Sequence, residues 1–194
     1  MMKYFELQFY DNDSYLLEVS KVDRHKYITC STCKMILDKR NLIEKHLPTY
    51  MIKRKKYHLS GSYDGFKVVS QEFKDLYEVS DWQGLVFYPI PKSKGLYLVE
   101  CFQQVVINET KRPIEFENKC NECGLYMGVY GSVPSYMDAD VIQKLKPNTF
   151  YRSNLEFGYD FEQGYSLFAS QEITDKLIKH KLIIKKDLIE VLCI

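Results

Sequence analysis

The stretch NKCNECGLYMG, residues 118–128, contains two cysteines that are separated by two residues and followed by a glycine. This spacing lets both thiolates of a tight turn face one metal ion. One pair supplies only half of a tetrahedral shell, and the stretch TCSTCKM, residues 29–35, carries a second pair about ninety positions upstream. The sequence therefore predicts that two distant turns meet at one ion.

The expected ligands are Cys30, Cys33, Cys120 and Cys123. Four thiolates around one Zn²⁺ leave no open coordination position, so we expect a single, structural ion rather than a catalytic one. Two other interpretations stay open, namely a thioredoxin-like redox pair and cysteines that pack in the core with accidental spacing. Cys101 and Cys193 lie in strand-like apolar runs, where we expect buried thiols.

The residue that follows each cysteine pair differs between the two turns. Gly124 follows the second pair and can adopt a left-handed backbone, which lets amide hydrogens point at the sulfurs. Lys34 occupies that position in the first turn, where the same conformation would cost about 1–2 kcal/mol. One expectation is therefore a different geometry in the first turn. The other is that the Lys34 ammonium offsets the double negative charge of a zinc ion held by four thiolates.

A second regularity is an internal echo, because KVVSQEFKDLYE at residues 67–78 matches LFASQEITDKLI at residues 167–178. In both stretches an apolar strand runs into a serine, and an amphipathic helix follows. Serine is a preferred helix N-cap, and an acid suits the first helical turn, so capping explains the residues without a catalytic role. We infer an internal duplication. The repeated residues are Ser70, Gln71, Glu72 and Asp75 in the first copy and Ser170, Gln171, Glu172 and Asp175 in the second.

These patterns predict an α+β fold with mixed or antiparallel sheets and few short helices. Two pseudo-repeated halves, residues 1–94 and 95–194, are expected to form one compact unit bridged by the zinc knuckles. The turn PIPKSKG, residues 89–95, is the expected boundary between them. We also expect a long strand over residues 95–107 and a short helix over residues 136–146, which Pro147 stops.

The composition is that of an ordinary globular chain, with 194 residues, 45% hydrophobic residues and a net charge of +1. No phosphate-binding loop, dinucleotide fingerprint or nucleophile elbow occurs, and the histidines form no metal or catalytic pattern, so we expect no enzyme. No apolar run reaches the length of a membrane span, and acids interrupt the N-terminal stretch. The expected location is therefore the cytoplasm, without a membrane partner, where cysteines stay reduced.

One basic run, KRKKYH at residues 53–58, favours a different class of protein. Lys53, Arg54, Lys55 and Lys56 could contact phosphates while neighbouring tyrosines stack on bases. The bland interpretation is a solvated loop or strand edge, where lysines discourage edge pairing. Because the 27 basic residues are matched by 26 acidic ones, nucleic acid is the less favoured partner.

Two C-x-x-C(G) turns about ninety residues apart, in a chain near this length, resemble the double-CXXCG motif family of bacterial proteins. The closing stretch GYSLFASQEITDKLIKHKLI, residues 164–183, also resembles the end of immunity proteins from polymorphic toxin systems. The specific matches are the four cysteines and Gly124, while Lys34 stands where the family has glycine. The resemblance implies a cytoplasmic zinc-binding protein that neutralises a cognate protein toxin by binding it.

An acidic, tyrosine-rich stretch, LEFGYDFEQGY at residues 155–165, is the candidate partner surface. Its side chains could mimic phosphate against a basic nuclease toxin, and tyrosine is enriched at protein interfaces. The alternative function is a zinc-ribbon-like nucleic-acid-binding or regulatory protein that uses the basic run. The candidate partner residues are Glu156, Tyr159, Asp160 and Glu162.

Overall fold

The structure is a computed structural model, and it describes residues 2–17, 29–111, 113–131 and 133–194. Mostly antiparallel sheets and a few short helices make up the described residues, so the predicted α+β class is confirmed. The elements are β1 (Tyr4–Leu7), β2 (Tyr10–Asp11), η2 (Arg40–Leu42), α1 (Ile43–His46), β3 (Leu59–Gly61), β4 (Lys67–Ser70), α2 (Gln71–Val79), β5 (Leu85–Pro89), β6 (Leu96–Cys101), β7 (Gln104–Val105), β8 (Glu115–Lys119), β9 (Tyr126–Tyr130), β10 (Tyr136–Met137), α3 (Ala139–Lys144), β11 (Tyr151–Tyr159), η3 (Asp160–Glu162), β12 (Gly164–Ser170), α4 (Gln171–Lys179), η4 (Lys185–Asp187), β13 (Leu188–Glu190) and β14 (Leu192–Cys193).

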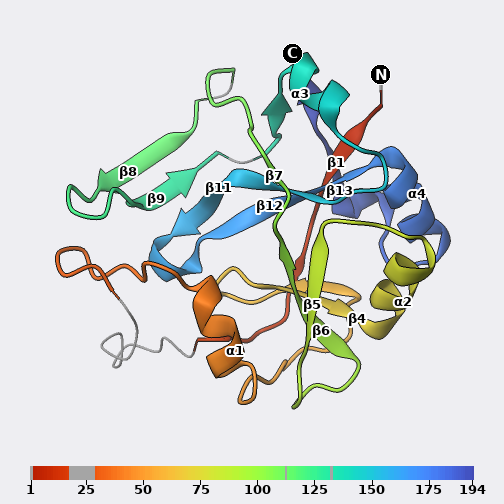
Figure 1. Cartoon of the computed structure of the whole chain (residues 1–194), viewed down its shortest axis with the longest axis horizontal. Helices are drawn as coiled ribbons and strands as arrows, with labels where there is room; N and C mark the ends of the chain where they lie inside the picture. The colour runs from red at the N-terminus through yellow and green to blue at the C-terminus, as the bar shows by residue number, and fades with distance from the viewer. Residues whose placement is uncertain (1, 18–28, 112, 132) are drawn as a thin grey trace.

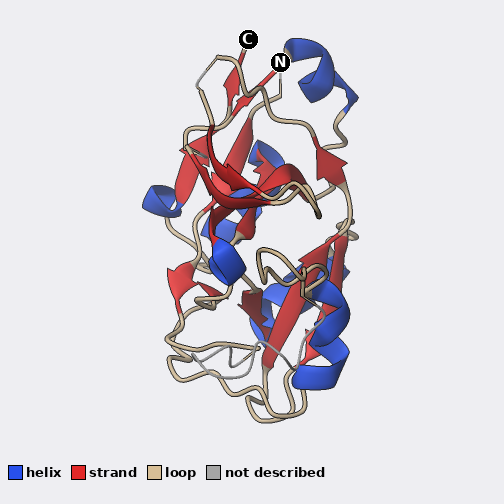
Figure 2. Cartoon of the chain, turned by 90° about the vertical axis from the view of Figure 1, so that its left-hand side faces the viewer, coloured by secondary structure: helices blue, strands red, loops and turns tan. Residues whose placement is uncertain are grey.

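Two large sheets carry the fold, and Figure 2 shows them one above the other. The five-stranded sheet has the order β2-β3-β4-β6-β5, and the seven-stranded sheet has the order β13-β1-β12-β11-β9-β8, with β7 beside β11. A third, two-stranded sheet joins β10 to β14. The hairpin β8–β9 extends from the seven-stranded sheet at the left of Figure 1.

The predicted echo appears as two strand–helix units that are built alike. Ser70 caps α2 by accepting a hydrogen bond from the Phe73 amide, and Ser170 caps α4 by accepting one from the Ile173 amide. Both helices have nine residues, and both are followed by a residue with positive φ, Asp81 at 49° and Lys181 at 60°. The likeness therefore extends from the N-cap through the turn that ends each helix.

The N-terminal strand β1 completes the second unit. It lies between β12 and β13 and is antiparallel to both, just as β6 lies between β4 and β5. In both units, the first amide of the helix donates to the carbonyl of the residue that precedes the central strand. Gln71 donates to the carbonyl before β6, and Gln171 donates to the carbonyl before β1. The central strand of the second unit thus comes from the opposite end of the chain.

The sheets do not divide the chain at residue 94. The turn at residues 89–95 lies inside the β5–β6 hairpin, and β1 belongs to the sheet of the C-terminal strands. The prediction of one long strand over residues 95–107 is wrong, because the strand ends at Cys101. Its first part, β6, stays in the five-stranded sheet, while β7 pairs with β11 in the other sheet. The chain crosses between the sheets at this break, and a single straight strand cannot do so.

The largest buried cluster lies where the two helices meet both sheets. Phe73 of α2 and Ile173 and Leu177 of α4 are fully buried there, beside Trp82 and Phe150. Figure 1 shows α2 and α4 on the same side of the molecule. The two units therefore share one core. In the described part of the chain, no helix has the length and apolar character needed to cross a membrane.

Candidate metal centre

The second cysteine pair forms the turn of the hairpin β8–β9. Lys119 pairs with Tyr126 at the end of the ladder, and the turn between them holds Cys120 and Cys123. The Cys120 amide donates to the Leu125 carbonyl at 2.9 Å, and the Gly124 amide donates to the Cys120 carbonyl at 2.9 Å. Gly124 has a φ of 75°, so the expected left-handed glycine is present.

The first pair lies in a turn of the same design. A bridge between Thr29 and Ile36 closes it, the Cys30 amide donates to the Met35 carbonyl at 2.9 Å, and the Lys34 amide donates to the Cys30 carbonyl at 3.0 Å. Lys34 has a φ of 63°, close to that of the matching glycine. The expectation of a different geometry is therefore wrong, since the lysine accepts the left-handed conformation. Its ammonium donates to the Ser31 carbonyl within the turn.

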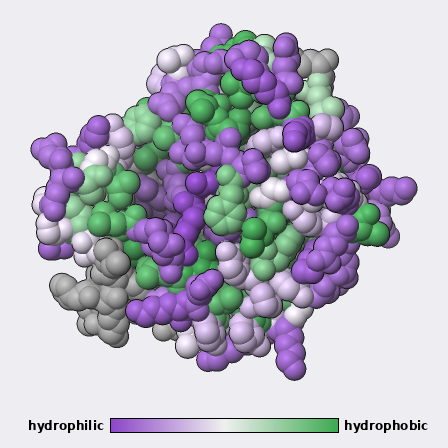
Figure 3. Space-filling view, in the orientation of Figure 1, coloured by the Kyte–Doolittle hydropathy of each residue, from purple (hydrophilic) through white to green (hydrophobic). Residues whose placement is uncertain are grey.

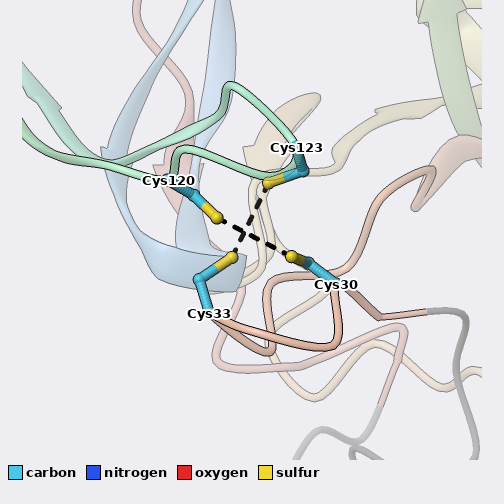
Figure 4. Close-up of side chains that lie close together, drawn as sticks. All are labelled: Cys30, Cys33, Cys120 and Cys123. Carbon is cyan, nitrogen blue, oxygen red and sulfur yellow. Dashed lines mark hydrogen bonds between the residues drawn. The ribbon is translucent and has the colours of Figure 1, made fainter.

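The two turns bring four sulfurs together, as Figure 4 shows. The Sγ atoms all lie within 4.8 Å of one another, and the Cys30–Cys120 and Cys33–Cys123 sulfurs are each 3.7 Å apart. A regular tetrahedron with metal–sulfur bonds of about 2.3 Å has edges of about 3.8 Å between sulfurs. The spacing across the turns is therefore that of a four-thiolate metal site.

Burial and backbone amides shift the pKa values of Cys33 and Cys120 in opposite directions. Cys30 and Cys120 are 3% and 7% exposed, while Cys33 and Cys123 are half-buried. Amides of Cys123 and Glu122 hydrogen-bond the Cys120 sulfur and lower its pKa to about 7, whereas burial raises the pKa of Cys33 to about 12. A cation at the centre would stabilise all four as thiolates, so binding of a metal there would release protons.

The residues between the cysteines form a second link between the turns. The carboxylate of Glu122 accepts hydrogen bonds from the Ser31 hydroxyl, at 2.7 and 2.8 Å, and from the Thr32 hydroxyl. These hydroxyls lower the pKa of Glu122. Sequence reasoning missed this link, because the spacer of a C-x-x-C motif carries no rule about its partner. The four cysteines and the residues between them thus lie at the contact of the same two turns.

The four cysteines fit a structural metal by the chemistry of their donors. The cluster contains thiols alone, and soft thiolates select zinc or iron–sulfur chemistry over hard cations. All four positions of a tetrahedron would be filled by the chain, which leaves no place for a reacting water. Such a site fastens the tip of the hairpin to residues 29–36, about ninety positions away in the sequence.

The other two cysteines lie outside the cluster. Cys101 is 1% exposed and donates to the Phe150 carbonyl, as expected of a buried thiol, and burial raises its pKa to about 12. Cys193 lies in β14 and is exposed, so the expectation that it is buried is wrong. Leu192 and Cys193 are both exposed, because β14 belongs to a small two-stranded sheet at the molecular surface.

The structure separates the candidate partner residues into two groups. Tyr159 is 47% exposed and Glu162 is exposed, with Asp160 between them in η3. Glu156 instead faces inward, where Arg40 and Arg152 pair with its carboxylate and Lys39 lies 3.9 Å away. Its charge is therefore already balanced inside the protein rather than presented at the surface.

The basic run lies in a loop before β3, and its four cations are exposed. Tyr57, which follows it, stacks on Tyr10 with ring centroids 4.5 Å apart, and the Lys56 ammonium lies 4.9 Å from the Tyr57 ring. The expected closeness of lysines and tyrosine is thus present, although one face of Tyr57 is already covered by Tyr10.

The chain matches no protein-family model and none of the curated proteins with which it was compared.

Proposed function

We propose that this chain is a non-enzymatic zinc-binding protein that acts by binding another protein. The observation that carries the proposal is the pair of 3.7 Å sulfur–sulfur distances between turns whose sequences lie ninety residues apart. A closed four-thiolate shell suits a structural Zn²⁺, and a structural ion leaves function to the surfaces that it holds in place. The reducing cytoplasm is the compartment in which such thiols persist.

The partner that we propose is a cognate protein toxin, which makes the chain an immunity protein. The double C-x-x-C pattern and the closing strand–helix–strand support this proposal by resemblance. An exposed Tyr159 at the end of β11, followed by the exposed Glu162 in η3, supports it by chemistry, since an aromatic residue close to acids suits a basic partner. Glu156 is left out of this surface because its carboxylate is bound internally.

The test is calorimetric titration with the C-terminal domain of the protein encoded by the neighbouring upstream gene. The proposal expects one-to-one binding and relief of that domain's toxicity by the metal-loaded chain. Glu162→Lys combined with Tyr159→Ala should weaken binding at least tenfold. Glu172→Lys on α4, which changes another exposed acid, is the control and should bind like the wild type. A folded, metal-loaded chain that neither binds nor protects would overturn the proposal.

A second candidate is nucleic-acid binding through Lys53, Arg54, Lys55 and Lys56. The specific observation in its favour is that these four contiguous cations are exposed beside the Tyr10–Tyr57 stack. Binding to single-stranded DNA or RNA should then fall steeply with salt and vanish when the four are neutralised. Neutralising Lys92 and Lys94, which are exposed in the β5–β6 turn, is the control. Salt-independent or absent binding would remove this candidate.

A further inference from the structure

A cleft of about 370 Å³ lies between the metal centre and the seven-stranded sheet. Met35 and Leu125, which follow the two cysteine turns, form one wall, and Phe116 of the hairpin continues it. Arg152 and Glu156 of β11 line the cleft as well. In Figure 3, hydrophobic side chains gather over the hairpin at the left, beside a strongly hydrophilic area at its foot. The volume suits a compact small molecule.

Arg40 and Lys39 also line this cleft, and both cations already have partners within the protein. The Arg40 Nε donates to Glu100 Oε2 at 2.9 Å, and its Nη2 donates to Glu156. Lys39 is likewise engaged, because its ammonium donates to the carbonyls of Asp64 and Gln163. The carboxylates of Glu100 and Glu156 therefore already have cationic partners, and they are not free to bind a cation from solvent.

Arg152 differs from these cations because the structure shows no hydrogen bond from its guanidinium to the described residues. Its side chain is 17% exposed, and the one ion pair it makes within the described residues is a 3.5 Å contact with Glu156 Oε1. Its Nε is shielded from solvent and has no hydrogen-bond partner in that same part of the chain. The guanidinium carbon lies over the Tyr165 ring, 5.6 Å from the centroid. A largely buried guanidinium that lacks a protein acceptor depends on water or on an anion to accept its hydrogen bonds.

The backbone of β11 is irregular at the same place. The β11–β12 register shifts between Arg152 and Glu156, and the Ser153 hydroxyl replaces a ladder partner by accepting from the Ser166 amide at 3.0 Å. Bulges of this kind redirect side chains and are common beside binding sites. The irregularity therefore lies in the part of β11 that carries Arg152 into the lining of the cleft.

We propose that this cleft binds a small organic anion, whose carboxylate or phosphate pairs with the Arg152 guanidinium. Carboxylates and phosphates match the planar fork of arginine with two parallel hydrogen bonds. The apolar body of the ligand lies against Phe116, Leu125 and Tyr126, which also line the cleft. Asp38 and Asp160 also line the cleft and repel a second negative charge, so a singly charged carboxylate is the better ligand. This inference does not depend on the proposed function.

Three probes of nearly equal size test the proposal, namely phenylacetate, phenyl phosphate and the uncharged 2-phenylethanol. Each is titrated into the metal-loaded chain, and binding is followed by calorimetry and by NMR shifts of the cleft amides. We expect saturable binding of phenylacetate, weaker binding of phenyl phosphate, and at least tenfold weaker binding of 2-phenylethanol. If phenyl phosphate binds more tightly than phenylacetate, the ligand is a phosphate ester and the preference for a single charge is wrong.

Variants assign the binding to the guanidinium. Arg152→Gln should weaken anion binding at least tenfold, and Arg54→Gln, the same change in the exposed loop, should leave it unaltered. Arg152→Lys keeps the charge without the fork and should weaken binding several-fold. Should Arg152→Gln fail to fold, Arg152→Lys and the comparison of probes in the wild type still decide. The proposal is overturned if neither anion saturates, if 2-phenylethanol binds equally well, or if both Arg152 variants bind like the wild type.

Discussion

At the scale of single residues, the two cysteine turns show how one backbone accommodates two different side chains. Gly124 adopts its left-handed conformation freely, whereas Lys34 adopts nearly the same φ at a conformational cost. The sequence identified the strained position, because the motif places glycine there in one turn and lysine in the other. It did not reveal that Lys34 would adopt the left-handed conformation, since that conformation depends on the tertiary contact that brings the four sulfurs together.

Lys34→Gly should stabilise the metal-loaded protein by about 0.5–1 kcal/mol. Relief of about 1–2 kcal/mol of left-handed strain is partly offset by the greater freedom of glycine in the unfolded chain. Denaturant unfolding of the metal-loaded wild type and variant measures the difference. Gly124→Lys is the matched control and should destabilise by about 1 kcal/mol, because a Cβ there meets no atom within 4 Å and only conformation changes. A loss of stability in Lys34→Gly would show that the lysine side chain outweighs its strain.

Lys67 should make stability depend on alkaline pH. Its ammonium is buried between the Phe9 and Tyr165 rings, and burial lowers its pKa to about 8, although Glu6 and Glu100 oppose the shift. Between pH 8 and 10.5 the unfolded chain therefore binds more protons than the folded one. The contribution of Lys67 to stability consequently rises as pH increases through that window.

The measurement compares the unfolding free energies of the wild type and Lys67→Met at pH 7.5 and pH 10. The stability of the wild type relative to the variant should increase by about 2 kcal/mol over this interval. Buried tyrosines such as Tyr4, whose pKa burial raises to about 12, titrate in both proteins and cancel in the comparison. A constant or falling difference would mean that Lys67 keeps its ordinary pKa in the folded state.

At the scale of elements, local sequence signals correctly predicted the capped helices. The prediction of one long strand over residues 95–107 failed because non-local strand pairing decides where that strand ends. Ser70 and Ser170 each mark the start of a helix, because the serine hydroxyl accepts a hydrogen bond from the amide only three residues later. The local sequence is therefore enough to predict both helix starts. The break after Cys101 has no such local signal, because the apolar run continues from β6 into β7. It depends on pairing with β4 in one sheet and with β11 in the other.

The two caps should differ in strength although their sequences match. Ser70→Ala should cost about 1 kcal/mol, the usual value for a lost cap. Ser170→Ala should cost more, about 2 kcal/mol, because Ser170 is fully buried and its hydroxyl also donates to the Pro147 carbonyl, which would be left without that partner. The Ser70 hydroxyl contacts the half-exposed His58 ring instead, and water can replace that contact. Equal denaturant midpoints for both variants and the wild type would contradict this ranking.

At the scale of the whole molecule, the sequence predicted which cysteines meet more completely than it predicted which strands form each of the two strand–helix units. Residue spacing alone paired Cys30 and Cys33 with Cys120 and Cys123, and the structure brings all four together. The predicted division at residue 94 assigned β1 to the N-terminal half, whereas β1 is the central strand of the second strand–helix unit. A short N-terminal strand carries no sequence signal of its partners, because pairing energy is contributed by side chains from the distant end of the chain.

Loss of one ligand should release the metal and loosen the hairpin β8–β9. Cys120→Ser is expected to lose stoichiometric metal and to lower stability by several kcal/mol, since metal binding and folding are coupled in such sites. Hydrogen exchange should rise first in the hairpin and in residues 29–36. Cys193→Ser, a change at an exposed cysteine outside the cluster, should keep both metal and stability. A metal-free Cys120→Ser protein as stable as the wild type would contradict a structural role for the metal.

The most direct measurement is X-ray absorption at the zinc edge, on protein purified under reducing conditions and assayed for total metal. We predict one Zn²⁺ per chain with a shell of four sulfurs at about 2.3 Å and no oxygen or nitrogen ligand. Such a shell would establish that the two turns close on one ion. A chain that folds without stoichiometric metal, or a shell in which water or another light ligand replaces sulfur, would contradict the closed structural site.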